Sequence, residues 1–229
     1  INSDGTGRGY LGAGGSHALE TTMDEIAKGL TDPQTGVSIY ERRKANAFVN
    51  ATATAAKKTI AGGKQLTLSA LGSGSDYSAF LQHLGLTTLN LGFGGEDDGG
   101  EYHTNFDTYA HYEKYKDPGF EYGALLSKLA GHTALRLANA DILPYDFGRL
   151  HKTIDEYLKD LASFTDNYRE ATQLDNKALK DGYFAMAKDP TAPLLPPVAK
   201  PEVPYLDFSA IQNALADLDK TTAALNAHW

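Results

Sequence analysis

Short apolar runs separated by glycine-rich stretches occupy the middle of the chain. Residues 66–68 and the alternating residues 87–91 have the pattern of short strands. Residues 76–84 between them suit a helix that ends at Gly85. A strand, a helix and a second strand in this order indicate a βαβ unit. The pattern predicts an α/β protein in which this region is part of a mostly parallel sheet with helices.

Helical spacing is clear at two places in the first 150 residues. In residues 17–30 the apolar positions stand four, three and four residues apart, and Pro33 follows the last of them. These positions are Leu19, Met23, Ile26 and Leu30. A second helix is expected between Asp117-Pro118 and Pro144. Its apolar positions are Leu125, Leu126, Leu129, Leu137 and Ile142.

Two other stretches of this region are less regular. Residues 4–16 are rich in glycine, which favours a loop with unusual dihedral angles over a regular element. Residues 38–58 have few apolar positions among alanine, threonine and charged residues. They are consistent with a surface segment or with an inserted helix.

The pattern changes after Phe147, where two amphipathic helices are expected. Their apolar stripes run through residues 150–168 and 211–225, and each stripe must pack on another surface. The connector at residues 189–204 contains six prolines, too many for a helix or a central strand. We therefore expect two domains, residues 1–147 and 148–229, with an extended Pro-rich connector inside the second.

Composition narrows the function. The net charge is −8 and the lysines and arginines are scattered, so nucleic acid is not an expected partner. The chain has no cysteine, so any metal must be held by His, Asp or Glu. No apolar run approaches the roughly 20 residues needed for a membrane span. The chain opens on Ile1, in what reads as the end of a strand, and we expect sequence upstream of it.

Gly72-Ser73-Gly74-Ser75-Asp76 is one candidate binding loop. Main-chain amides at a helix N-terminus favour an anion such as a substrate carboxylate. The same residues also fit a simple turn with Ser75 as an N-cap. The pattern alone leaves both interpretations open.

His103 is a candidate zinc ligand, because it follows a flexible acidic loop that could orient its ring. In a helix, His103, Asp107 and His111 would share one face and offer another metal site. A surface histidine fits as well. Glu96, Asp97 and Asp98 read as a solvated acidic turn, without the ligand pattern of an EF-hand.

Asp4 stands at an expected strand end, just before glycine-rich residues. In α/β proteins metal ligands often lie at such ends, so Asp4 is a candidate ligand. An aspartate at this place is as often a residue that forms a turn. Serine-type catalysis is not expected, since the chain has no Gly-x-Ser-x-Gly motif.

Several segments, taken in order, resemble motifs of the glutamate carboxypeptidase II and transferrin receptor family. They are residues 71–85 (LGSGSDYSAFLQHLG), 102–109 (YHTNFDTY), 117–120 (DPGF), 137–140 (LANA) and 143–146 (LPYD). Asn2-Ser3-Asp4 matches the Asn-x-Asp at which that family places a zinc-binding aspartate. The resemblance runs from Asn2 to Phe147, with a divergent patch at residues 36–65.

The resemblance implies a co-catalytic two-zinc peptidase with an aminopeptidase-like α/β domain. A metal-bridging water would attack the peptide bond and a carboxylate would act as general base. Asp4 would bind one zinc ion and His103 the other. The pocket for the C-terminal residue of the peptide substrate would be lined by Ser73, Gly74, Ser75 and Tyr102.

The departures from the family pattern matter equally. The remaining ligands and the general base of the family precede Asn-x-Asp, so this chain is not expected to be catalytically competent or to bind zinc tightly. The arginines that serve acidic substrates would fall near Asn90 and Gly92, so a preference for acidic peptides is in doubt. Ser75 stands where asparagine is commoner, which would change contacts to the substrate.

The resemblance also interprets the two expected domains. Residues 1–147 would be the C-terminal part of the peptidase domain. Residues 148–229 would be the incomplete start of the helical domain through which the family forms homodimers. An extracytoplasmic location is expected on the same basis. The alternative is a non-catalytic, transferrin receptor-like module for dimerisation or partner binding. Retention of both Asp4 and His103 favours the peptidase.

Overall fold

The computed structural model describes residues 1–63, 67–97, 99–191, 193, 195 and 197–227. It divides into two compact units, residues 1–150 (unit 1) and 151–229 (unit 2). The first residue of the strand predicted at 66–68, Leu66, lies outside the described residues, as do Asp98, Pro196 and Trp229. No helix within the described ranges is both long and apolar enough to cross a membrane.

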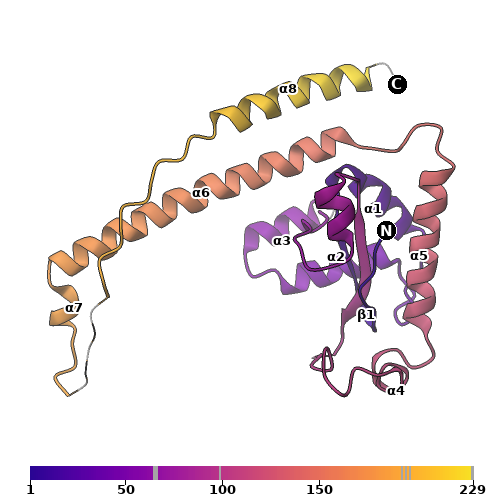
Figure 1. The fold of residues 1–229 in the computed structure, drawn as a ribbon, viewed down its shortest axis with the longest axis horizontal. Coiled ribbons are helices and arrows are strands. Elements are labelled where there is room, and N and C mark those ends of the chain that lie inside the picture. The colour runs from indigo at the N-terminus through magenta and orange to yellow at the C-terminus, as the bar shows by residue number, and fades with distance from the viewer. Residues whose placement is uncertain (64–66, 98, 192, 194, 196, 228–229) are drawn as a thin grey trace. The chain divides into compact units, whose positions relative to one another are not determined.

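The described part of unit 1 combines two strands with helices (Figure 1). In chain order its elements are β1 (Gly9–Gly15), η1 (His17–Leu19), α1 (Glu20–Lys28), α2 (Ile39–Asn50), α3 (Thr54–Ala61), η2 (Ala79–His83), β2 (Leu89–Gly95), α4 (Tyr109–His111), η3 (Tyr112–Lys116) and α5 (Glu121–Ala138). Helix α6 (Phe147–Lys180) begins in unit 1 and continues into unit 2. The prediction of a mixed α/β protein is confirmed.

The sheet differs from the predicted one. Strands β1 and β2 pair antiparallel, from Gly9 opposite Gly95 to Gly15 opposite Leu89. Parallel pairing in the described part of unit 1 is confined to two single bridges, Asn2 with Asn90 and Gly14 with Ser69. The mostly parallel sheet is therefore not confirmed. Near the expected first strand of the βαβ unit, the pairing seen in the described residues is the single bridge of Ser69 with Gly14 of β1.

The prediction of a loop at residues 4–16 is wrong for its second half, which forms β1. The sequence is strand-like in one respect, because Leu11 and Ala13 are two residues apart and both are buried. The glycines between and after them allow close approach of neighbouring chain segments. A Cβ atom at Gly14 would lie 2.8 Å from Leu71 Cδ2 and 3.0 Å from the Ser69 carbonyl oxygen.

The core of unit 1 forms where α1, α2 and α5 pack against the sheet (Figure 1). All four predicted apolar positions of residues 17–30 are buried, which confirms that helical face. The sheet contributes Leu11, Ala13, Leu89, Leu91 and Phe93, and α5 contributes Tyr122, Leu125 and Leu129. Residue Ile142 was expected in this helix, but α5 ends at Ala138 and Ile142 is exposed.

Local hydrogen bonds explain where several helices begin. Ser38 and Glu41 form a reciprocal capping box at the start of α2, so the open choice at residues 38–58 is settled in favour of helices. The buried carboxylate of Asp117 accepts hydrogen bonds from the amides of Tyr122 (3.2 Å) and Gly123 (2.8 Å). Asp117 therefore anchors the first turn of α5, as its position in the sequence predicted, although the helix starts later.

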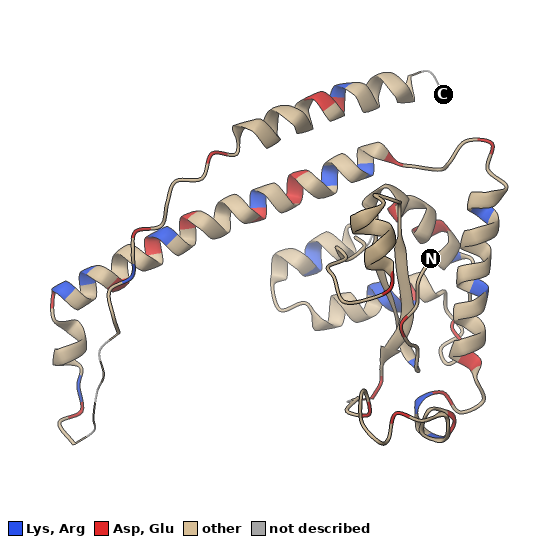
Figure 2. Cartoon of the chain, in the orientation of Figure 1, with Lys and Arg blue, Asp and Glu red and all other residues tan. Residues whose placement is uncertain are grey.

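Unit 2 contains the remainder of α6, with α7 (Tyr183–Met186) and α8 (Ser209–Asn226). Helix α8 runs beside α6 in the opposite direction, since His151 lies 3.8 Å from Asp219 and Leu158 and Leu215 border one pocket (Figure 1). Both predicted amphipathic helices are thus confirmed, and α6 is longer than its apolar pattern indicated. Figure 2 shows basic and acidic residues interspersed along α6.

Part of the Pro-rich connector lies along α6. The side chain of Asn176 donates to the carbonyl oxygen of Lys200 (2.8 Å) and accepts from its amide (2.9 Å). Arg169 donates to the carbonyl oxygen of Pro204 at 3.2 Å. These bonds satisfy main-chain groups that a proline-rich segment cannot pair within a helix or sheet.

Buried charges of α1 fasten the first turn of α6 within unit 1. The Arg149 side chain forms an ion pair with Glu20, with Nε 2.7 Å from Oε2. Glu20 also accepts a hydrogen bond from the Leu68 amide at 3.0 Å.

Asp24 lies one helical turn after Glu20 and is also buried. Its Oδ2 atom has no hydrogen-bond partner among the described residues. Burial raises the pKa of Asp24 to about 6, against opposing charges on Lys28, Arg43 and Arg149.

The stability of the chain should therefore depend on Asp24 in weakly acidic solution. Its folded-state pKa of about 6 exceeds the ordinary 3.8, so ionisation favours the unfolded chain. The free energy of unfolding should fall by up to about 3 kcal/mol between pH 4 and pH 7 through this group. Asp24→Asn should lack that part of the fall in chemical denaturation at pH 4, 5, 6 and 7. Exposed Asp141 supplies the control variant Asp141→Asn, and equal pH profiles for the two variants would contradict the assignment.

Candidate functional site

Asp4 is positioned by the pairing of residues 2–7 with β2. Asn2 donates its amide to the Leu89 carbonyl oxygen (2.7 Å) and accepts from the Leu91 amide (3.0 Å). Further along, the Gly7 amide donates to the carbonyl oxygen of Phe93 at 2.9 Å. Asp4 lies between these two points of attachment, so its main chain is held beside β2.

Three neutral side chains donate hydrogen bonds to the Asp4 carboxylate. Ser75 Oγ (2.5 Å) and Asn2 Nδ2 (3.1 Å) both donate to Oδ1, and Asn90 Nδ2 donates to Oδ2 at 3.1 Å. The bond from Ser75 contributes most to lowering the pKa of Asp4, with smaller contributions from Asn2 and Asn90. The carboxylate is therefore ionised and fixed in orientation without a cationic partner among these donors.

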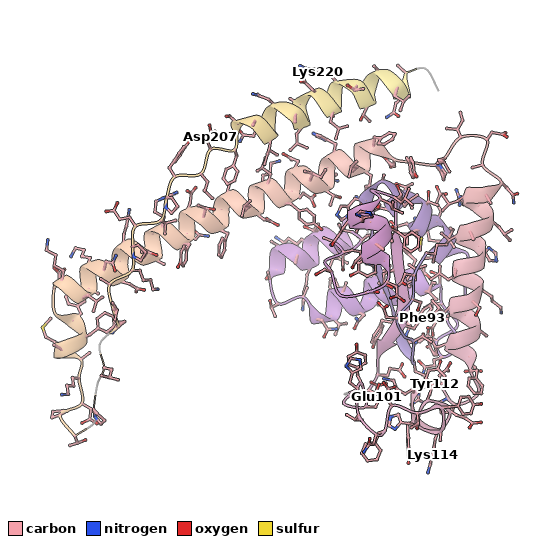
Figure 3. All side chains as sticks on the ribbon, viewed as in Figure 1. Phe93, Glu101, Tyr112, Lys114, Asp207 and Lys220 are labelled. Carbon is pink, nitrogen blue, oxygen red and sulfur yellow. The ribbon has the colours of Figure 1, made fainter. Side chains whose placement is uncertain are left out.

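A cavity of about 370 Å³ borders Asp4. Its lining comes from residues 4–7, from residues 93–97 with 101–102, and from residues 107–116. Its polar side chains are Asp4, Thr6, Asp97, Glu101, Tyr102, Asp107, Thr108, His111, Tyr112 and Lys116. Figure 3 shows Phe93, Glu101 and Tyr112 at one end of unit 1. The cavity is thus an acidic pocket with aromatic walls, lined by segments that are distant in sequence.

Lys116 contributes a positive charge to the lining of this cavity. Its ammonium group pairs closely with Glu101 and lies 3.6 Å from Asp97. Burial lowers the pKa of Lys116, but the bond to Glu101 and the charge of Asp97 outweigh burial and raise it above its usual value. On the far wall, burial and the neighbouring Asp117 raise the pKa of Tyr112 to about 12, so its hydroxyl stays protonated at neutral pH.

The acidic turn after β2 is exposed at Glu96 and Asp97, as the sequence predicted, but Glu96 is also paired. Glu96 accepts from Arg42 at 2.5 Å and from Gln34 at 2.9 Å. Arg42 also forms a 2.7 Å ion pair with Asp32 and lies over the ring of Tyr10. The composition of the turn indicated only its charge. The partners of Glu96, Arg42 and Gln34, are distant from it in sequence and could not be predicted.

His103 does not belong to the lining of this cavity. It has a positive φ of 58°, and its ring stacks on Tyr102 with centroids 3.8 Å apart. Its amide donates to Asp107 Oδ2 at 3.3 Å. Residues 103–107 are not helical, so the idea that His103, Asp107 and His111 share one helix face is wrong. Asp107 and His111 nevertheless both border the cavity.

The predicted substrate loop is placed near Asp4 through Ser75. Residues 77–83 are helical and end at Gly85, as predicted, but Ser75 is not their N-cap. Its hydroxyl donates to Asp4 and accepts from Asn2 instead. Ser73 and Gly74 lie in an exposed loop, and the helical turn after them is too short to support the anion-site interpretation. The sequence contained no signal for the bond between Ser75 and Asp4, which are 71 residues apart.

Of the predicted site residues, Asp4 and Tyr102 border one cavity, and Ser75 is hydrogen-bonded to Asp4. The assignment of Asp4 and His103 to two zinc ions, and of Ser73, Gly74, Ser75 and Tyr102 to a substrate pocket, stays a prediction. Within the described ranges, no group of three or more His, Asp or Glu side chains is placed to hold a metal ion.

Comparison with known proteins identifies relatives of one class. An aminopeptidase NAALADL1 from Mus musculus is 30% identical over 186 residues, which are 77% of this chain and 23% of that protein. A probable glutamate carboxypeptidase from Arthroderma benhamiae is 32% identical over 173 residues, 74% of this chain and 20% of the relative. The probable glutamate carboxypeptidase VP8 from Zea mays is 37% identical over 107 residues, 47% of this chain and 15% of that protein. No protein-family model matches the chain.

These relatives define a family of carboxypeptidase- and aminopeptidase-type peptidases. The chain belongs to the glutamate carboxypeptidase II-like family, matched over part of its length. It spans about a fifth of the length of these relatives, between 15% and 23%.

The close approach of residues 4–7 to β2 can be tested at Gly92. A Cβ atom at Gly92 would lie 2.7 Å from the carbonyl oxygen of Gly5, next to Asp4. Gly92→Ala should therefore displace residues 4–6 and lower the free energy of unfolding by about 1–3 kcal/mol. Chemical denaturation measures the loss, and the amide NMR shifts of residues 4–6 report the displacement.

Gly94→Ala is the matched control on the same strand, because a methyl group at Gly94 would have no atom within 4 Å and the φ of Gly94 is not positive. It should leave those amide shifts nearly unchanged. Equal effects of the two substitutions on the shifts would show that Gly5 does not pack on Gly92.

Proposed function

We propose that this chain forms part of the active site of a co-catalytic two-zinc peptidase that hydrolyses peptide bonds. The observation that carries the proposal is the Asp4 carboxylate, held by Ser75, Asn2 and Asn90 at the edge of a cavity. The family of the relatives supports the reaction class. The alternative of a non-catalytic module has no such observation in its favour.

The donors present are compatible with zinc. Carboxylate oxygen and imidazole nitrogen are ligands that zinc accepts, and a ligating carboxylate is commonly oriented by hydrogen bonds from neighbouring groups. In the proposal Asp4 would hold one zinc ion and His103 the other. Zinc held there would supply an activated water and polarise the peptide carbonyl. The residues of this chain orient the Asp4 ligand and bind the peptide.

We propose that Ser73, Gly74, Ser75 and Tyr102 bind the C-terminal residue of the peptide. Tyr102 is exposed and borders the cavity, and Ser75 donates a hydrogen bond to Asp4, which borders the same cavity. An arginine at position 92 would collide with the Gly5 carbonyl oxygen, and the Asn90 amide is already engaged with Asp4. The proposal therefore includes no requirement for an acidic substrate.

The proposal also holds that this chain by itself is inactive and binds zinc weakly. Asp4 and His103 would each contribute a single ligand to a different ion. One ligand cannot replace the three or four that hold zinc in a stable site. The other ligands and the general base would come from a preceding part of a longer protein.

The decisive experiment uses a longer protein that contains this chain and its upstream sequence. Asp4→Ala and His103→Ala should each lower bound zinc per molecule and reduce peptide hydrolysis by at least about 100-fold, because loss of a ligand removes the metal that activates water. Zinc is measured by elemental analysis and hydrolysis with unblocked dipeptides. The control is His132→Ala, a substitution of an exposed histidine in α5.

In parallel, the 229-residue chain is dialysed against chelator and titrated with zinc. Weak binding is expected. One tightly bound zinc per chain would contradict the proposed split of ligands, and full zinc and activity in both alanine variants would refute the assignment of Asp4 and His103.

We further propose that unit 2 takes part in a homodimer. Three apolar side chains of α6 lie one turn apart and are exposed: Leu161, Phe164 and Tyr168. The rings of Phe164 and Tyr168 stack with centroids 6.0 Å apart, which makes a continuous apolar surface. A second copy of this chain is the occupant we propose.

Phe164→Asp tests the dimer. A charge in the centre of an apolar contact should raise the dissociation constant at least about tenfold, since each 1.4 kcal/mol is a factor of ten. Sedimentation equilibrium across a concentration series gives the constant, with Asn167→Asp at a neighbouring exposed position as control. A wild-type chain that stays monomeric at every concentration would exclude the proposal.

A further inference from the structure

Lys116 is the last residue of η3 and joins the three segments that enclose the cavity. Its ammonium group binds Glu101, the residue just before Tyr102, and lies 3.6 Å from Asp97. Its carbonyl oxygen accepts from the Arg8 amide at 3.1 Å. One residue thus connects the segment after Asp4, the loop after β2 and the η3 turn.

The end of the Lys116 side chain is held in place by its neighbours. Its side chain is 19% exposed and that of its partner Glu101 is 15% exposed. A Cβ atom at Gly7 would lie 3.5 Å from Lys116 Cε, so the end of the aliphatic stem lies close to the main chain at Gly7. The pair is therefore more constrained than a typical surface ion pair.

The turn that follows Glu101 carries Tyr102 and His103. The Thr104 amide donates to the Glu101 carbonyl oxygen at 3.0 Å, and the Thr104 hydroxyl donates to the same oxygen at 2.7 Å. Within this turn His103 adopts its positive φ and stacks on Tyr102. Movement of Glu101 would consequently move the turn and both rings.

We infer that Lys116 is a positioning residue of the candidate site, which fixes Glu101 and thereby the orientation of Tyr102 and His103. The inference rests on the proposed function, in which Tyr102 binds the peptide and His103 binds zinc. Lys116 acts through Glu101 rather than on either ring. Arg42 holds the opposite end of the same loop through Glu96, so that the loop is attached to the fold at both ends.

The experiment compares Lys116→Met, Lys116→Arg and Lys114→Met in the zinc-free 229-residue chain. Methionine keeps the apolar stem but removes the charge, and arginine restores the charge. Lys114 lies on the same turn and contacts the Tyr115 ring, which makes it the matched control (Figure 3). Amide hydrogen exchange of Thr104 and the imidazole proton shifts of His103, assigned with His103→Gln, are followed by NMR.

Lys116→Met should speed exchange of the Thr104 amide about fivefold, the change expected for loss of a partly buried ion pair. It should also shift the His103 protons toward the values of an unstacked ring. Exchange of the buried Leu91 amide in β2 should stay unchanged, which separates a local effect from global loss of stability. Lys116→Arg should return both signals to wild type, and Lys114→Met should not move them.

Glu101→Gln approaches the same contact from the other side and should reproduce the effect of Lys116→Met. The inference is overturned if Lys116→Met leaves the Thr104 and His103 signals as they are in Lys114→Met, or if arginine fails to restore them. Because these signals are measured without zinc or peptide, they are independent of whether the longer protein proves to be a zinc peptidase.

Discussion

The hydrogen bonds between Asn2 and β2 are the constraint on which the candidate site depends. They hold the first residues parallel to β2, while β1 pairs with the other edge of β2 in the opposite direction. Asp4 consequently lies beside Asn90 and within reach of Ser75. Glycine at position 92 permits this proximity, since any side chain there would meet the main chain of Gly5. Main-chain pairing therefore sets the position of Asp4, and the side chains around it then orient its carboxylate.

Two cations hold the loop that follows β2. Arg42 binds Glu96 at its start and is itself fixed by buried Asp32, and Lys116 binds Glu101 at its end. An acidic loop without such partners would be repelled by its own charge and remain in solvent. With both ends fastened, the loop presents Tyr102 on the wall of a cavity that Asp4 also borders. The ion pairs of Arg42 and Lys116 therefore hold the loop in position in addition to balancing its charge.

Membership of the glutamate carboxypeptidase II-like family and the geometry of this chain support each other over a limited span. The relatives are matched over about a fifth of their length. Within that span, three hydrogen bonds orient the carboxylate of Asp4, and its role as a ligand stays a prediction. His103 stacks on Tyr102 and lies outside the cavity lining.

The sequence by itself determined the features that depend on local periodicity and on ordered motifs. The buried face of α1, the amphipathic helices α6 and α8, the anchoring of α5 by Asp117 and the family all followed from residues close together in the chain. The tertiary structure alone decided that glycine-rich residues 9–15 form β1, that Ser75 binds Asp4, and that Glu96 and Glu101 are paired with Arg42 and Lys116. Most of those outcomes depend on contacts between residues far apart in the chain, such as Asp4 and Ser75, which are 71 positions apart. Hydrophobic spacing contains no information about which distant polar groups will meet.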